Sequence, residues 1–231
     1  MQVNDILDTL ADFKDVFGIE TGIANKEEKQ VNIDSKTINN HKRIVCLENI
    51  DKHIYRRAFG TIRLLESIKK FNKGHSYHFM TGGDVDALSY LQLILLHQPL
   101  EYCLFSTWCM AAPDVVMFDD WLTNKKIAKL DAYVGEIFPS SYPEQWIMLN
   151  ELIDKHKCGR IAVFRNHSKI FAGYGPKFAF GIETSANIMT NPRAENGCIT
   201  IGEEIYKFYR EYFDGIISIV KKEIKNAGQE S

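Results

Sequence analysis

Two short polar motifs, each flanked by apolar residues typical of strands, carry the side chains of this sequence that could do chemistry. His167 and Lys169 are two residues apart, and so are Ser185 and Asn187. Because residues two apart on a strand point to the same face, we expect each pair to share a face, on a strand or at its end. If neighbouring strands bring these faces together, a nucleophilic imidazole lies beside donors suited to the oxygens of a phosphate.

A third polar stretch, Asn191-Pro-Arg193-Ala-Glu195-Asn196, follows closely and adds a guanidinium and a carboxylate. Taken alone, His-x-Lys is weak evidence, since such pairs are common on surface strands, and Ser-x-Asn is common in turns. The ordered set of three motifs, separated by short apolar runs, is much harder to obtain by chance.

In this order the motifs resemble those of the phospholipase D superfamily, and best its small single-motif members, the phospholipase D-like endonucleases. The resemblance spans about residues 75–213, and its specific part is 167–196. Two positions depart from the family pattern. The acid that follows His-x-Lys would fall at Tyr174, and the glycine usual before Ser-Ala-Asn is Thr184.

The resemblance implies a role for each polar residue. His167 would attack phosphorus and form a covalent phosphohistidine, while Lys169 and Asn187 hold the developing negative charge. Ser185 would assist by hydrogen bonding. Glu195 would accept a hydrogen bond from the other imidazole nitrogen, which fixes the tautomer and supports the imidazolium.

Arg193 is expected to join Lys169 and Asn187 in binding the substrate. The whole chain has a formal net charge of −2, which gives no general attraction to nucleic acid or to an acidic membrane. Between residues 155 and 193, however, seven Lys/Arg residues and one acid leave +6 (seven minus one). A solvated face is the plain interpretation of such a cluster, but its coincidence with His-x-Lys favours an anionic substrate.

The remaining sequence predicts how these motifs are positioned. Helical patterns occur at 3–14, 52–71, 87–96, 113–125, 143–157 and 203–225. Strand-like runs occur at 77–81, 102–108, 127–134, 160–171, 177–184 and 197–201. Their alternation predicts an α/β fold with a central sheet covered on both sides. The resemblance implies the same kind of fold, a three-layer sandwich with a central mixed β-sheet flanked by helices.

In the run 177–184, large apolar residues alternate with Ala179, Gly181 and Glu183. This pattern predicts a buried large face and a small face that continues into Ser185 and stays open to the site.

Three further expectations concern the helices. Arg57 is among the basic residues expected on the solvated face of the helix at 52–71. Asp86 is expected to cap the helix at 87–96. In the helix at 203–225, Phe208 and Tyr212 are among the apolar residues expected in the core.

Residues 1–50 form a predicted N-terminal extension or arm, and 51–231 a phospholipase D-like domain with one His-x-Lys motif. The five cysteines form no C-x-x-C pair, which is typical of reduced thiols rather than of a disulfide framework or zinc site. No apolar run is long enough to span a bilayer, and the N-terminus lacks a signal-type core. We expect a cytoplasmic protein that uses no metal or other cofactor and binds no membrane.

The first hypothesis is a metal-independent phosphodiesterase, a nuclease acting on DNA. Since the chain has one His-x-Lys, the resemblance implies a site shared across a homodimer. The alternative is a catalytically inactive nucleic-acid or phosphate-binding module, which the departure at Tyr174 supports. A lipid or other small-phosphodiester hydrolase is a third possibility, but no basic amphipathic helix marks a membrane surface.

Overall fold

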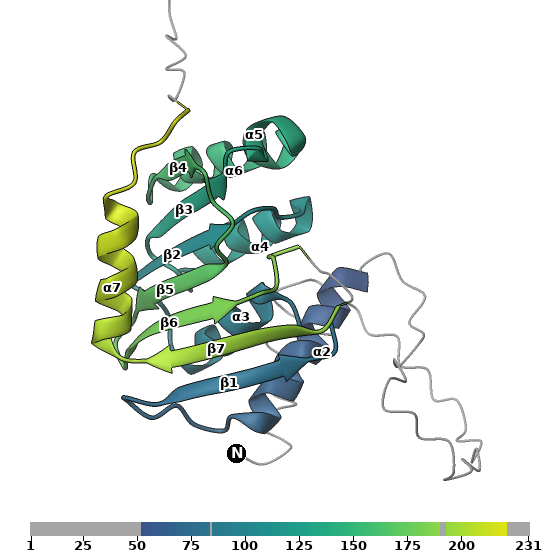
Figure 1. Ribbon diagram of the computed structural model, residues 1–231, viewed down its shortest axis with the longest axis vertical. Helices are drawn as coiled ribbons and strands as arrows, with labels where there is room; N and C mark the ends of the chain where they lie inside the picture. Colours follow the sequence, from purple (N-terminus) through teal and green to yellow (C-terminus); the bar gives the residue numbers. More distant parts are fainter. Residues whose placement is uncertain (1–51, 84, 190–192, 221–231) are drawn as a thin grey trace, which may run out of the picture. The chain divides into compact units, whose positions relative to one another are not determined.

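The computed structural model describes residues 52–83, 85–189 and 193–220, so the predicted helix at 3–14 and the arm at 1–50 lie outside the described residues (Figure 1). A seven-stranded sheet forms the middle layer, with strand order β1-β7-β6-β5-β2-β3-β4. Figure 1 shows α7 on one face and α2, α3, α4 and α6 on the other. The predicted three-layer α/β sandwich with a central mixed sheet is confirmed.

The seven strands are β1 Ser76–Thr81, β2 Tyr102–Thr107, β3 Leu130–Gly135, β4 Ile161–Phe164, β5 Ile170–Tyr174, β6 Ala179–Thr184 and β7 Glu195–Ile201. Strands β2, β3 and β4 are parallel, and the other pairings are antiparallel. The ends of β1, β2, β3, β4 and β6 therefore lie on the same edge as the starts of β5 and β7. We call this the carboxyl edge, after the parallel strands that end there, and the opposite one the amino edge.

The described helices are α2 Lys52–Ser67, α3 Ala87–His97, α4 Ala112–Thr123, α5 Phe138–Ser141, α6 Pro143–His156 and α7 Glu203–Asp214. The predicted cap of α3 is confirmed, because the Asp86 side chain accepts a hydrogen bond from Ser89 N at 2.9 Å. Short α5 was not predicted.

Helix α7 ends at Asp214, well before the predicted residue 225. Gly215 follows it, and the tail beyond bonds to the outer strand β4, where Ile219 N donates to Val163 O at 2.8 Å. Tyr209 is buried, and so is Phe213, which was not among the predicted core residues. Phe208 and Tyr212 are exposed, so their assignment to the core was wrong.

The small face of β6 is covered by α7 rather than open to a site. A Cβ atom added to Gly181 would lie 2.7 Å from Ile205 Cγ1 and 3.2 Å from Tyr209 Cε2. The hydroxyl of Tyr209 also donates to Glu183. The prediction that the small face stays open to the site was therefore wrong. The small residues of β6 instead allow α7 to approach the sheet closely.

The solvated position predicted for Arg57 was also wrong. Its side chain is 2% exposed, and its Nε atom donates to both oxygens of Asp86, at 3.0 and 2.9 Å. Its Nη2 atom lies 2.7 Å from Asp114 Oδ1. Since Asp86 caps α3 and Asp114 accepts from Ala111 N at the start of α4, one cation neutralises two buried capping carboxylates.

No described helix is both long and apolar enough to cross a membrane. Nor do three or more His, Cys, Asp or Glu side chains of the described ranges gather in a way that could hold a metal ion. Cys103, Cys109, Cys158 and Cys198 are free thiols.

Candidate active site

The predicted strand at 160–171 is two strands with a loop between them. β4 ends at Phe164, β5 begins at Ile170, and the connecting loop carries His167 and Lys169. Lys169 O accepts a hydrogen bond from Thr184 N at 3.1 Å, at the end of β6. The chain thus brings His-x-Lys next to the Ser-x-Asn turn on the carboxyl edge, through loops rather than through strand alternation.

The side chains of His167 and Lys169 are in direct contact. The Lys169 ammonium is 2.9 Å from Nδ1 and 3.5 Å from Nε2 of the ring, and it donates to His167 O at 2.6 Å. One nitrogen of a neutral imidazole has a lone pair in the ring plane and the other has an N–H bond, and the two point away from each other. An ammonium near both nitrogens therefore lies over the ring rather than along the lone pair. The imidazole, which is exposed, keeps its lone pair available.

Lys169 is only 7% exposed, unlike His167. Burial lowers the pKa of its ammonium below the usual 10.5, and the charges of Cys109 and Glu195 act in the opposite direction. Among the described residues, no hydrogen bond or ion pair joins this ammonium to the Glu195 carboxylate, which bonds to Ser185 instead.

Ser185 and Glu195 form the other half of the site. The hydroxyl of Ser185 donates to Glu195 Oε2 and accepts from Asn196 N at 3.0 Å. Glu195 is the first residue of β7, and its carbonyl accepts from Thr81 Oγ1 at 3.3 Å. In the part of the chain that the structure describes, the carboxylate bonds to Ser185 and not to His167, the partner that the resemblance implied.

Asn187 and Arg193 lie on the same edge without a described contact to those four residues. The backbone carbonyl of Asn187 accepts from Ala87 N at 3.5 Å, which attaches the turn to the start of α3. Its Oδ1 atom is buried and has no hydrogen-bond partner among the described residues. Arg193 is exposed. The structure therefore pairs His167 with Lys169 and Ser185 with Glu195, and the roles of all six residues stay predictions.

Asn166 was not singled out in the sequence, yet it holds the loop that carries His167. Its Nδ2 atom donates to Ser106 Oγ at 2.9 Å, and its Oδ1 atom accepts from Ser168 N at 2.9 Å and Ser168 Oγ at 2.7 Å. This buried amide joins the loop to the end of β2. A polar residue after an apolar run signals a turn, but the sequence does not show that this one is buried.

Trp108 lies directly beside the imidazole. The ring centroids of Trp108 and His167 are 5.2 Å apart and the planes are tilted by 52°. A Cβ atom added to Gly135 would be 2.7 Å from Trp108 Cδ1, so glycine there makes room for the indole. Trp108 is half-exposed and forms one wall of the candidate site.

The basic stretch at 155–193 does not form one patch around the site. Lys155, Arg160 and Lys177 bond to groups on α4, β3 and the end of α3, away from the carboxyl edge. Arg165 and Arg193, both exposed, remain on this edge with Lys169. The charge of +6 in the sequence therefore overstates the local attraction for an anion.

The two departures from the family pattern have structural explanations. Tyr174 ends β5 at the amino edge, where its ring lies 5.2 Å from Tyr206 and 6.3 Å from Tyr102. Thr184 Oγ1 donates to Asn196 O at 2.8 Å and accepts from Ala186 N at 3.1 Å, which fixes the Ser-x-Asn turn. Tyr174 thus lies on the edge opposite the candidate residues. An acid in its place would not lie next to them, so the tyrosine does not deprive the candidate site of a carboxylate.

No family model matches the sequence, and no curated protein matches it. Among solved structures it is similar to polyphosphate kinase from Porphyromonas gingivalis, with 12% identity and a TM-score of 0.47 over 69% of this chain and 29% of that one. It is also similar to NucT from Helicobacter pylori, with 13% identity and a TM-score of 0.45 over 62% and 96% of the two chains. Phosphatidylserine synthase from Haemophilus influenzae Rd KW20 gives 13% identity and a TM-score of 0.43 over 60% and 37%.

These three proteins are members of the phospholipase D superfamily. This chain spans less than a third of the polyphosphate kinase. At TM-scores below 0.5, the likeness carries no conclusion about the reaction.

Proposed function

We propose that the protein is a metal-independent phosphodiesterase with His167 as its nucleophile. The observation that carries this proposal is the contact between an exposed imidazole and the ammonium of Lys169, at 2.9 Å from Nδ1. An anionic phosphate drawn to that ammonium is brought next to the imidazole lone pair. Proximity of this kind is what turns a weak nucleophile into an effective one.

The proposed reaction has two displacements. A ring nitrogen of neutral His167 forms a bond to phosphorus, the bond to the leaving oxygen breaks, and an acid at the site gives that oxygen a proton. Water then attacks phosphorus and returns a proton to the same group, the bond to nitrogen breaks, and the phosphate leaves as a monoester. Lys169 stabilises the negative charge on the non-bridging oxygens in both steps, with Asn187 and Arg193 as further donors.

The Ser185–Glu195 pair supplies a site for the proton. Glu195 bonds to Ser185 on the edge of the sheet that also carries Lys169. A second imidazole could instead serve as the acid if two subunits share one site about a two-fold axis, as the single His-x-Lys implies. Sedimentation at assay concentration distinguishes the two, because a fully active monomer is incompatible with a shared site.

The proposed substrate is a nucleic acid, with DNA as the first choice. Arg165 and Arg193 are exposed cations on the edge that carries Lys169, and a polynucleotide offers them the phosphates on either side of the one being cleaved. Because this edge carries only a few cations, it favours contact with a short stretch of nucleic acid rather than binding along a basic groove.

The deciding experiment is hydrolysis of plasmid DNA, single-stranded DNA, RNA and a chromogenic phosphodiester, each with and without excess chelator. We expect cleavage of DNA and of the chromogenic ester that survives the chelator. Loss of activity with chelator and its return with magnesium would contradict the proposed mechanism, because an ammonium and not a metal ion is assigned to the phosphate.

The second candidate function is a phosphate-binding module without turnover. It is favoured by the absence, among the described residues, of a hydrogen bond between Glu195 and the imidazole. Binding of the same substrates without any product, at a stoichiometry of one per site, would establish this function instead.

A further inference from the structure

A cavity of about 580 Å³ lies beside the Ser185 end of the candidate active site. Its lining comes from β1, the end of β6 and the start of β7, and it includes Ser185 itself. The volume is within the range of sites that hold small ligands. A molecule whose phosphate lay at Lys169 could therefore extend past Ser185 into this cavity.

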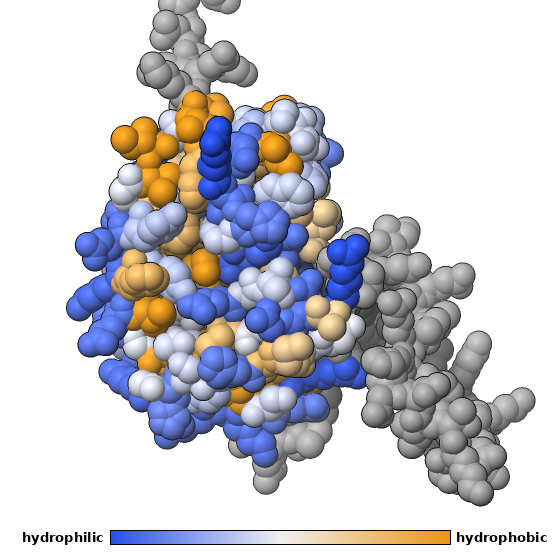
Figure 2. Space-filling view, viewed as in Figure 1, coloured by the Kyte–Doolittle hydropathy of each residue, from blue (hydrophilic) through white to orange (hydrophobic). Residues whose placement is uncertain are grey.

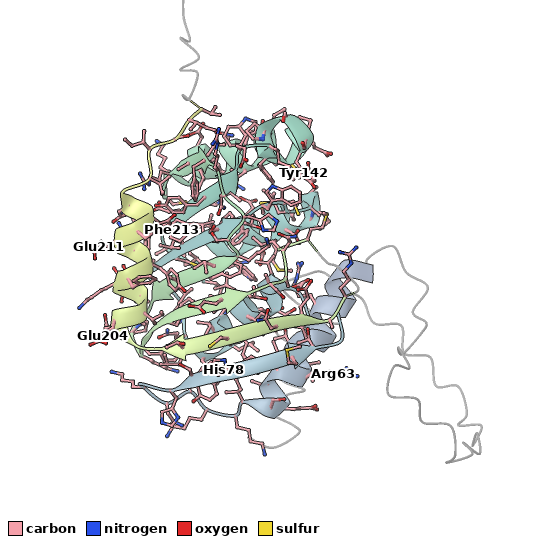
Figure 3. The ribbon with its side chains drawn as sticks, viewed as in Figure 1. Arg63, His78, Tyr142, Glu204, Glu211 and Phe213 are labelled. Carbon is pink, nitrogen blue, oxygen red and sulfur yellow. The ribbon has the colours of Figure 1, made fainter. Side chains whose placement is uncertain are left out.

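One wall of the cavity is a row of three side chains across neighbouring strands. Glu183 is paired with Cys198, and Cys198 with His78, in the strand register. The Cys198 sulfur and His78 Nε2 are 3.9 Å apart, and the Glu183 carboxylate accepts from the hydroxyl of Tyr209. α7 contacts β5 and β6, while His78 lies on β1, below the helix in Figure 3. The row thus runs from Glu183 on β6, a strand that α7 covers, to His78 on β1, which lies beyond the helix.

The chemistry of the lining favours a neutral, flat and polar group. No lysine or arginine is among its described residues, so a second phosphate would find no cation there. The side chains of His78 and Asn196 offer hydrogen-bonding groups, and Met80, 79% exposed on β1, offers a flexible apolar surface. Figure 2 shows that the surface over β1 and β7 mixes hydrophilic and hydrophobic residues, unlike the continuous apolar wall that an acyl chain requires.

We propose that this cavity binds the nucleoside of the substrate, with its base against Met80 and within hydrogen-bond reach of His78 and Asn196. The inference rests on the proposed function, since it places the scissile phosphate at His167 and Lys169. It adds that the site recognises one nucleoside of the ester rather than the phosphate alone. Methionine packs well against flat aromatic groups, and a neutral amide suits the polar edge of a base.

The test compares two kinds of ester with the same leaving group. One is a thymidine p-nitrophenyl phosphate, prepared as the 5′ and as the 3′ ester, and the other is methyl p-nitrophenyl phosphate, which has no base. For wild-type protein, we expect kcat/KM to be higher for at least one thymidine ester than for the methyl ester. His78→Ala and Asn196→Ala should each lower that advantage about tenfold, the effect of losing one hydrogen bond.

A control variant and a third cavity variant make the result specific. His75→Ala removes an exposed histidine just before β1 that does not line the cavity, and it should leave both rates unchanged. Cys198→Phe should fill the cavity and remove the thymidine advantage. An unchanged rate with the methyl ester shows that each variant is folded.

If wild-type protein hydrolyses both esters with equal kcat/KM, or the advantage survives in all three cavity variants, the inference is wrong while the proposed function stands. If neither ester is hydrolysed, the proposed function fails, and calorimetry still tests the cavity. Thymidine 5′-monophosphate should then bind at least tenfold more tightly than inorganic phosphate, and His78→Ala should remove the difference. Equal binding of the two would overturn the inference.

Discussion

Arg57 lies 2% exposed between the carboxylates of Asp86 and Asp114, whereas His167 is exposed on the carboxyl edge with an ammonium over its ring. Both places combine positively charged groups with carboxylates. Between the helices, each carboxylate also receives a backbone amide, so every group has a fixed partner. On the carboxyl edge, the imidazole is exposed, and among the described residues no carboxylate forms an ion pair with the ammonium.

The difference separates charges that hold the fold from charges that can act on a ligand. Removing one member of a buried, fully paired set leaves an uncompensated charge in the protein. Removing an exposed imidazole leaves no such charge, so its loss should affect chemistry and not folding. The two clusters are therefore expected to respond to substitution in opposite ways.

The largest expected effect on activity comes from His167→Ala. We expect turnover to fall below detection, because no other described residue at the site is placed to form the covalent bond. The free energy of unfolding should change by no more than about 0.5 kcal/mol, since the side chain is exposed. Initial rates and urea denaturation on the same preparation measure both. Retained turnover would remove His167 from the mechanism, and loss of folding would make it a core residue.

Arg57→Ala should produce the opposite result. We expect the free energy of unfolding to fall by about 3–5 kcal/mol, because Asp86 and Asp114 are left buried without a cation. Lys69→Ala, an exposed change just beyond α2, is the matched control and should have little effect. Urea midpoints give both values. A stable Arg57→Ala protein would mean that these carboxylates do not depend on the guanidinium.

Lys169→Ala should lower kcat by about 10²–10³-fold, the usual cost of removing one donor to a developing oxyanion. A partly buried ammonium contributes more than an exposed one, because burial reduces the screening of its charge by water. Arg165→Ala, on the same edge but exposed, should have a much smaller effect. Equal losses from the two substitutions would indicate general attraction for the substrate and not stabilisation of the transition state.

The smallest predicted effect is a displaced pH profile. Lys169 acts in its charged form, and burial lowers its pKa, so kcat/KM should fall with rising pH through a value below the usual 10.5. Lys169→Arg keeps the charge at higher pH and should move this alkaline limb upward. Rates between about pH 7 and 11, corrected for spontaneous hydrolysis, measure the limb. If Lys169→Arg leaves the alkaline limb at the same pH, the limb reports the titration of another group.

Much of the fold could be predicted from local patterns. The sandwich follows from the alternation of helical and strand-like runs, and the cap at Asp86 from its place before an apolar helix. Interactions between distant segments could not be predicted. Gly181 is small because α7 packs on it, and Arg57 is buried because two capping acids from other helices meet it.

The candidate site shows the same division. From residue types and order alone, it stayed conditional whether His-x-Lys and the Ser-x-Asn turn would meet, and in the structure Lys169 O accepts a hydrogen bond from Thr184 N. The strand that was expected to orient His167 is a loop, held by the buried amide of Asn166. Neither that amide nor the indole of Trp108 belongs to a motif, so only the folded chain reveals them.

The most direct test of the account is to look for the covalent intermediate itself. A chromogenic phosphodiester with a good leaving group is mixed with excess protein and quenched in alkali within the first turnover, since phosphohistidine is stable to base and not to acid. We predict one added phosphoryl ester per site, located on His167 by peptide mass spectrometry and absent from His167→Ala. Full product release without any adduct, or an adduct on another residue, would contradict the central claim.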